Sequence, residues 1–318
     1  MHGFVGSCIA EARESLGDKP MCRQVWLLAA AALVTVWTLP TAAAAQDGAG
    51  AGSVEIATGV QVQNREDELG DLRRYVSETT TSTTLADGRA HERSNRQAFE
   101  LGTMAVTARG LLLRFTLREA QARDPEQPYL DALLKGWVDI SLEVMTNRSG
   151  APERIVNWPR AREAYSEALT RLAPEHSEIA TGVVAALDGM EDGPRAAAVL
   201  ADLVLLASAQ PRQPVREGRV DVAPETLTAS SGASMVVTRF AELGSIDADA
   251  CTAVYESGTT IAAGADATTT ETLRATLSTW DGWVVGLQQA SETTAPAGRV
   301  TKTVTIRRDP PGCGAPQS

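Results

Sequence analysis

The sequence predicts an α+β fold in which a curved antiparallel sheet, made of two strand-rich halves, carries a three-helix segment packed on it. Two observations predict this fold. Apolar and polar residues alternate over much of 54–158 and 219–318, whereas residues 159–208 repeat their apolar residues at helical spacing. Because strands and helices are segregated along the chain, an antiparallel sheet is favoured over alternating β-α-β units.

The N-terminal segment predicts export. Residues 25–39 form an apolar run (VWLLAAAALVTVWTL), which is shorter than the ~20 residues that a membrane-spanning helix needs. Ala43 and Ala45 provide the small residues of a cleavage site. We therefore expect residues 1–45 to be a signal peptide and the protein to be periplasmic.

Two details of this segment stay open. A start at Met21 is preferred, because residues 1–20 have balanced charge and make a poor positive region for a signal peptide. The alternative to cleavage is that residues 25–45 remain as an inner-membrane anchor. Residues 46–53 (QDGAGAGS) are expected to be a flexible linker.

The chain is acidic, with a formal net charge of −11. An acidic surface repels the phosphates of nucleic acids and of anionic lipids, so nucleic acid is not expected as a partner. Beyond the leader the chain has two cysteines, Cys251 and Cys313. In an oxidising compartment they are expected to form a disulfide, which on the loop-entropy model stabilises the fold by roughly 4 kcal/mol.

Two Thr-rich segments predict β-hairpins. Ser-Glu-Thr-Thr occurs at 77–80 and again at 291–294, and Gly-Arg follows each copy, at 88–89 and 298–299. Asp-Gly between β-prone runs is a strong hairpin signal. We interpret both copies as strand residues that lead into a turn, either from an old duplication or by chance.

The returning strand of the second hairpin has the clearer pattern. Val300, Val304 and Ile306 share one face, and Thr301, Thr303 and Thr305 share the other, as expected for a strand with one buried face. The remaining predicted strands are 54–62, 110–118, 137–146, 153–158, 226–240, 251–257 and 271–279. The acidic stretch 64–71 and the Pro-containing stretch 121–131 are predicted to be polar connections.

Three helices are predicted between the two halves. Asn157 is a candidate N-cap and Pro159 suits the first turn of a helix that ends before Pro174. A second helix is predicted from Ser177. The third, 194–208, is apolar nearly all round, so it is expected to be buried.

No motif predicts catalysis, a cofactor or a metal, and we expect the protein not to be an enzyme. His91 and His176 lie in no recognisable motif, and Asp247-x-Asp249 is followed by Cys251 and Thr252 where an EF-hand needs other residues. Gly-x-Ser-x-Gly is absent from the sequence.

Two groups of residues are candidates for surface sites. Trp280 and Trp283 frame a predicted tight turn, Asp281-Gly282, and packing over the end of a sheet is favoured over an exposed binding edge. The arginines between 89 and 118 are balanced by Glu92, Glu100 and Glu119, which is typical of a solvated strand face.

Residues 150–158 read GAPERIVNW, and a Gly-Trp strand with a Thr-rich hairpin closes the chain within 278–307. At 137–158 and 278–307 the sequence resembles a group of exported, uncharacterised bacterial β-rich proteins. These motifs are structural, so the resemblance implies no activity and transfers no catalytic residue. At the level of fold, the expected architecture is similar to that of periplasmic lipoprotein carriers, which is an analogy without a shared motif.

We therefore expect an exported protein that binds a lipid or another apolar or amphipathic ligand between sheet and helices. The alternative is a structural or protein-interaction component of the cell envelope in which helix 194–208 only fills the core.

Overall fold

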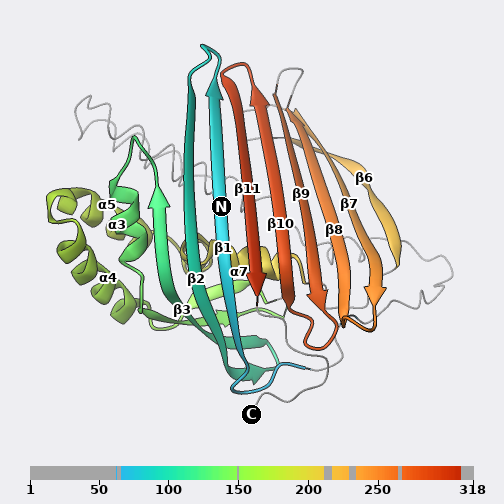
Figure 1. The fold of residues 1–318 in the computed structure, drawn as a ribbon, viewed down its shortest axis with the longest axis horizontal. Coiled ribbons are helices and arrows are strands. Elements are labelled where there is room, and N and C mark those ends of the chain that lie inside the picture. Colours follow the sequence, from blue (N-terminus) through green and yellow to red (C-terminus); the bar gives the residue numbers. More distant parts are fainter. Residues whose placement is uncertain are drawn as a thin grey trace. The chain divides into compact units, whose positions relative to one another are not determined.

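Eleven strands form one antiparallel sheet in a computed structural model of the chain, which describes residues 62, 66–148, 150–210, 217–228, 234–263 and 267–308. The order across the sheet is β5-β4-β3-β2-β1-β11-β10-β9-β8-β7-β6 (Figure 1). β5 and β6 are the two edges, so the sheet is not closed. The predicted signal peptide, the linker 46–53 and the predicted strand 54–62, apart from Val62, lie outside the described residues.

The strands are β1 (Leu72–Leu85), β2 (Ala90–Thr107), β3 (Gly110–Arg123), β4 (Ser141–Thr146), β5 (Pro152–Ile155), β6 (Gly218–Thr228), β7 (Ser234–Asp247), β8 (Thr252–Ala263), β9 (Ala267–Ser278), β10 (Val284–Ala295) and β11 (Gly298–Arg308). The helices are α3 (Tyr129–Lys135), α4 (Trp158–Leu172), α5 (Ser177–Asp188), α6 (Asp192–Val199) and α7 (Ala201–Ser208). Among the described residues, no helix combines the length and apolar character that a membrane crossing requires.

The two strand-rich halves join through β1 and β11. These strands pair antiparallel from Tyr75↔Arg308 to Leu85↔Gly298, so the first and last described strands lie side by side in the middle of the sheet (Figure 1). The two predicted hairpins, β1–β2 and β10–β11, are therefore neighbours, and the predicted antiparallel sheet is confirmed.

The two Ser-Glu-Thr-Thr copies both lie within strands, β1 and β10, as predicted. They do not occupy equivalent positions. Lys302 of β11 faces Thr81 on one side and Ser291 on the other, so Ser291 shares a row with Thr81 rather than with Ser77. Ser77 is buried and Ser291 is half-buried. Because of this shift in register, the two copies of the repeat do not form a common site.

The faces of the sheet differ as the alternation predicts. We call the face that carries Tyr75, Val304 and Ile306 the inner face, because these side chains are buried, and the opposite face, with Thr303, the outer face. Val300 shares the parity of Val304 but is 39% exposed. The buried part of the inner face therefore ends before the hairpin tips.

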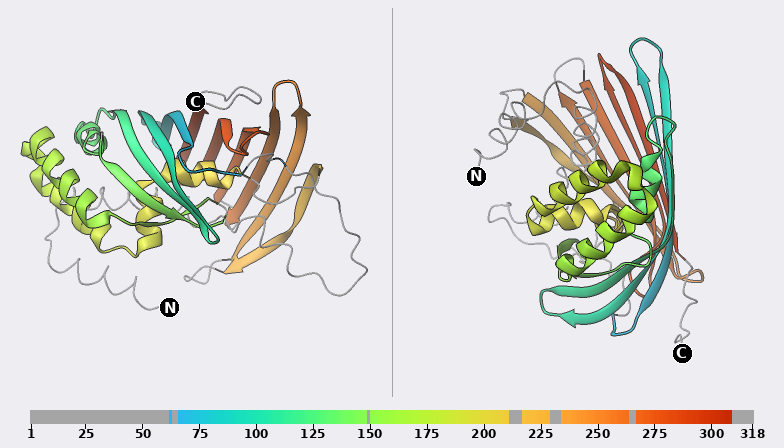
Figure 2. Two further views of the ribbon diagram at one scale, coloured as in Figure 1. Left: turned by 90° about the horizontal axis from the view of Figure 1, so that it is seen from below. Right: turned by 90° about the vertical axis from the view of Figure 1, so that its left-hand side faces the viewer.

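The helices pack on the inner face (Figure 2). Leu200, Leu203 and Leu206 are at most 1% exposed and belong to the same core as Tyr75 and Val304. At about 25 cal/mol per Å² of apolar surface, burying each leucine side chain contributes about 2 kcal/mol relative to exposure. The burial predicted for 194–208 is thus confirmed at these three leucines, whereas Ala198 and Ala201 are exposed.

The predicted number of helices in this segment was wrong. The third helix is interrupted at Leu200, whose φ of −119° and ψ of 42° leave the helical region, and the result is the pair α6 and α7. A single straight helix turns its apolar residues to all sides, whereas the break lets residues on both pieces reach the core. A further helix, α3, lies in and after the stretch predicted to be a loop.

Asn157 is not the side-chain cap that the sequence suggested. Its Oδ1 accepts a hydrogen bond from the Glu143 backbone N–H at 2.9 Å, and its Nδ2 donates to the Ser141 carbonyl at 2.9 Å. The residue therefore attaches the start of α4 to β4. Ser177 begins α5, as predicted.

The predicted connection 121–131 was wrong in part, because β3 extends to Arg123. The predicted strand 226–240 was also wrong, because β6 ends at Thr228 and β7 begins at Ser234. Within the acidic stretch 64–71, Asp67 is only 8% exposed, because it forms an ion pair that brings it into the interior.

Candidate ligand-binding site

A row of polar side chains crosses the inner face where the apolar core ends. Strand pairing sets the order of its members: Arg93, Thr81, Lys302, Ser291, Glu271 and Thr259, from β2, β1, β11, β10, β9 and β8. We call these six residues the inner polar row. Lys302 has the same parity along β11 as the buried Val304 and Ile306, so its side chain is directed to the inner face.

The row next to it, towards the core, is mixed. It contains Asn95, Thr79, Val304, Gln289 and Leu273 in successive strands. Val304 and Leu273 are core residues, whereas the side-chain oxygen of Asn95 is shielded from solvent and accepts no hydrogen bond from any described residue. A buried acceptor of this kind is costly unless another group satisfies it.

Asp202 brings a carboxyl group from α7 towards this part of the sheet. Burial raises the pKa of Asp202 to about 6, although the Ser77 hydroxyl and the Lys302 ammonium act in the opposite direction. Burial lowers the pKa of Lys302, and the carboxylates of Asp202 and Glu271 oppose this only in part. The two groups thus feel each other's charge within a poorly solvated region.

Glu271 already has a partner in the neighbouring strand, since the Gln289 Nε2 donates to its Oε1 at 2.5 Å. Within the described part of the chain, neither Arg93 nor Lys302 lies within ion-pair distance of a carboxylate. The inner polar row therefore offers two cations and several hydroxyl groups to a ligand, next to one carboxylate that is held in place. It can bind a polar group.

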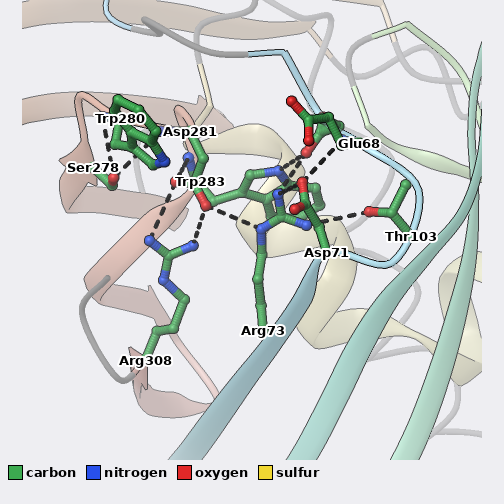
Figure 3. Close-up of polar contacts among 10 residues, drawn as sticks. Glu68, Asp71, Arg73, Thr103, Ser278, Trp280, Asp281, Trp283 and Arg308 are labelled. Atoms are coloured by element: carbon green, nitrogen blue, oxygen red, sulfur yellow. Dashed lines mark hydrogen bonds and ion pairs between the residues drawn. The ribbon is translucent and has the colours of Figure 1, made fainter. Parts of the chain in front are cut away.

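A second polar cluster lies at the opposite end of the central strands (Figure 3). Arg73 donates from Nη2 to Asp67 at 2.6 Å and from Nε to Asp281 at 3.2 Å, and its guanidinium lies 4.5 Å from the centre of the Trp283 ring. Arg308 donates to the same Asp281 at 2.9 and 3.2 Å. We call these five residues the Arg73 network.

The Arg73 network is a structural feature rather than a binding site. Burial alone would raise the pKa of Asp281, but the hydrogen bonds and charge of Arg308, together with Arg73, hold that pKa below its usual value. Trp283 is fully buried and donates from Nε1 to Asp67. The interior is thus occupied by ion pairs and an indole ring at this point, and the packing role predicted for Trp283 is confirmed.

The other sequence candidates are dispersed. Cys251 lies in the turn between β7 and β8, and Cys313 lies outside the described residues, so their disulfide stays a prediction. His91, predicted to be a residue without a ligand-like partner, has Nε2 at 3.3 Å from Asp124 Oδ1 and Nδ1 at 3.6 Å from Glu126 Oε1. His176 contacts the Tyr129 ring.

The remaining candidates have structural roles. Asp247 accepts a hydrogen bond from the Ala250 backbone N–H and so shapes a turn. Trp137 stacks on Tyr165 with ring centres 3.9 Å apart. In the described ranges, no three His, Cys, Asp or Glu side chains are arranged to hold a metal ion.

The inner polar row was not predicted from the sequence. A signal was present, because Lys302 stands between Val300 and Val304 on the same face of its strand. Recognising the row also required the partners of β11, which alternation within one strand does not reveal.

Comparisons with known proteins do not assign a family. No family model matches the chain. No curated protein matches it either. Among solved structures, an outer membrane channel from Pseudomonas putida F1 is similar at 9% identity and a TM-score of 0.22, over 76% of this chain and 97% of that chain. A similarity this low supports no conclusion on fold or function.

Proposed function

We propose that this chain is an exported binding protein that holds an amphipathic ligand on the inner face of its sheet, with the polar group of the ligand on the inner polar row. Lys302 is the observation that carries the proposal. Burial lowers its pKa, and no described carboxylate forms an ion pair with it. A partly buried cation without an ion pair costs free energy, which an anionic or hydrogen-bonding ligand would offset.

The position of the row also suits an amphipathic molecule. Val300 and Ile261 lie in the next row towards the hairpin tips, and both are partly exposed on the inner face. The apolar part of a ligand can contact these side chains while its polar group meets Lys302 and Arg93. The row contains neither histidine nor cysteine, so we propose binding and not catalysis.

A ligand on the inner polar row does not lie between the sheet and the helices, where the sequence predicts it. Leu203 and Leu206 pack directly on the inner face and are fully buried, which favours core filling by α7. The same packing favours a second candidate function, a protein-interaction component of the cell envelope that has no small-molecule ligand.

Native mass spectrometry of the protein isolated from the periplasm distinguishes the two functions. We expect a bound species in the wild type that is lost in Lys302→Gln and in Arg93→Gln. Arg114→Gln is the matched control, because Arg114 projects from the outer face of β3. Bare protein in every sample would refute ligand binding, and a co-purifying polypeptide would support the second function.

A further inference from the structure

The outer face has a separate feature, a hollow of about 540 Å³ over β1, β2, β3 and β11, strands that lie next to one another in Figure 1. Four arginines whose side chains belong to the outer face line it, together with two glutamates. These residues are Arg74, Arg96, Arg118, Arg307, Glu78 and Glu100. These six residues carry two more positive than negative charges. Asp139, at 3.0 Å from Arg118, and Glu119, at 3.6 Å from Arg96, offset this excess.

Two rows of alternating charge form the walls. In the first row, Glu100 of β2 accepts from Arg74 at 3.0 Å and from Arg118 at 3.0 and 2.9 Å. The hydrogen bond from Arg118 is the main cause that lowers the pKa of Glu100, against the effect of burial. In the second row, Arg96 lies between Glu78, at 3.4 Å, and Glu119, at 3.6 Å.

A β-bulge brings the second wall into place. The register between β2 and β3 shifts at Ala98 and Phe99, so Arg118 is an extra residue on β3. As a result Arg118 and Glu119 are both exposed although they are consecutive in the sequence. Without the bulge, alternation would turn one of these charges to the inner face.

Small side chains form the floor between the walls. Ala98 of β2 pairs with Val76 of β1, and Val76 pairs with Arg307 of β11. Because alanine and valine are much shorter than the arginines around them, the surface is hollow at this point and its floor is apolar. Arg307 is exposed and makes no ion pair with a carboxylate of the described residues.

We propose that this hollow binds a small organic carboxylate. The guanidinium of Arg307, which is not engaged by a carboxylate, would donate two hydrogen bonds to the carboxylate of the ligand. The apolar floor at Val76 and Ala98 would contact the carbon skeleton, so an organic anion is favoured over inorganic phosphate. This site lies on the opposite face from the inner polar row and does not depend on the function proposed above.

Calorimetric titration of the mature protein with citrate at low ionic strength tests the proposal. We expect saturable binding that weakens at least tenfold in Arg307→Gln and is partly restored in Arg307→Lys. Ala98→Leu is the sharper variant, because it fills the hollow and leaves every charge in place, and we expect it to abolish binding. Arg114→Gln removes an outer-face arginine that does not line the hollow, so it should bind as the wild type does.

Three other results would contradict the proposed carboxylate site. Equal weakening by Arg114→Gln and Arg307→Gln would show nonspecific attraction to positive charge. Unchanged binding in Ala98→Leu would exclude the hollow, and inorganic phosphate binding as tightly as citrate would exclude the role of the apolar floor. Circular dichroism and melting temperature of each variant establish that loss of binding does not reflect unfolding.

Discussion

Arg73 on β1 and Asp281 in the turn between β9 and β10 are 208 residues apart in the sequence, and their side chains are joined by a hydrogen bond of 3.2 Å. Asp281 also binds Arg308, so one carboxylate connects β1 and β11, the first and last described strands. The Arg73 network therefore joins the two strand-rich halves at the same place where β1 pairs with β11.

The first prediction concerns the removal of this charge. Asp281→Asn leaves two buried guanidinium groups without their shared counter-ion, which should lower the free energy of unfolding by about 3–5 kcal/mol. Urea unfolding followed by tryptophan fluorescence measures the loss. Asp221→Asn breaks the exposed pair with Arg219 and should cost less than about 1 kcal/mol. Equal effects of the two changes would contradict a structural role of the network.

Acid should weaken the same network. The folded-state pKa of Asp281 is below its ordinary value of 3.8, so the group contributes stability that is present above that value and is lost as pH falls through the folded pKa. Thermal melting measured from neutral pH down to about pH 2.5 should show a steep loss below about pH 4 in the wild type. The loss should be shallower in Asp281→Asn, and identical slopes would argue against this assignment.

Asp202 should have the opposite effect on the pH dependence of stability. Its folded-state pKa is raised to about 6, so its contribution to stability is fully present below the unfolded value of 3.8 and is lost as pH rises through about 6. Asp202→Asn should therefore stabilise the protein at pH 8, by at most about 3 kcal/mol, and should have little effect at pH 4. Glu167→Gln on the exposed side of α4 is the control. A destabilised Asp202→Asn at pH 8 would contradict the burial of an ionised carboxylate.

The two Gly-Arg turns should tolerate alanine differently. Both glycines have positive φ, 85° at Gly88 and 143° at Gly298, so both substitutions are strained. A Cβ at Gly298 would also lie 2.2 Å from the Thr84 carbonyl oxygen, whereas a Cβ at Gly88 meets no atom within 4 Å. Gly298→Ala should therefore lower the melting temperature more than Gly88→Ala does. A larger decrease in melting temperature for Gly88→Ala would show that the close approach of β1 and β11 does not determine the cost of these substitutions.

Thiol labelling tests the predicted disulfide between Cys251 and Cys313. If Cys251 and Cys313 are joined in the exported protein, they will resist thiol labelling in the denatured state until a reductant is added. Cys251→Ser, Cys313→Ser and the double variant should then be destabilised equally, by roughly 4 kcal/mol or less. Labelling of both thiols without reductant would contradict the prediction.

Much of the sheet could be predicted because the alternation within a strand is a local property. Val304 and Ile306 opposite Thr303 and Thr305 identify a strand and its buried face without knowledge of its neighbours. The burial of a helix could also be predicted from the sequence, because a helix that is apolar on all sides is buried in the protein interior. Predictions failed where one residue outweighed the local pattern, as at Leu200, where the helix breaks, and at Asp67, where an ion pair brings an acidic segment into the interior.

Strand order and register were decided only by tertiary structure, because they depend on contacts between residues far apart in the chain. Alternation assigns Lys302 to a face of β11, but only the pairing of β11 with β1 and β10 places it in a row with Arg93 and Glu271. The hollow around Ala98 depends in the same way on a bulge between β2 and β3 and on a neighbour, Arg307, from the end of the chain. Both candidate sites arise from side chains that strand pairing brings together, and a single strand carries too little information to specify its partners.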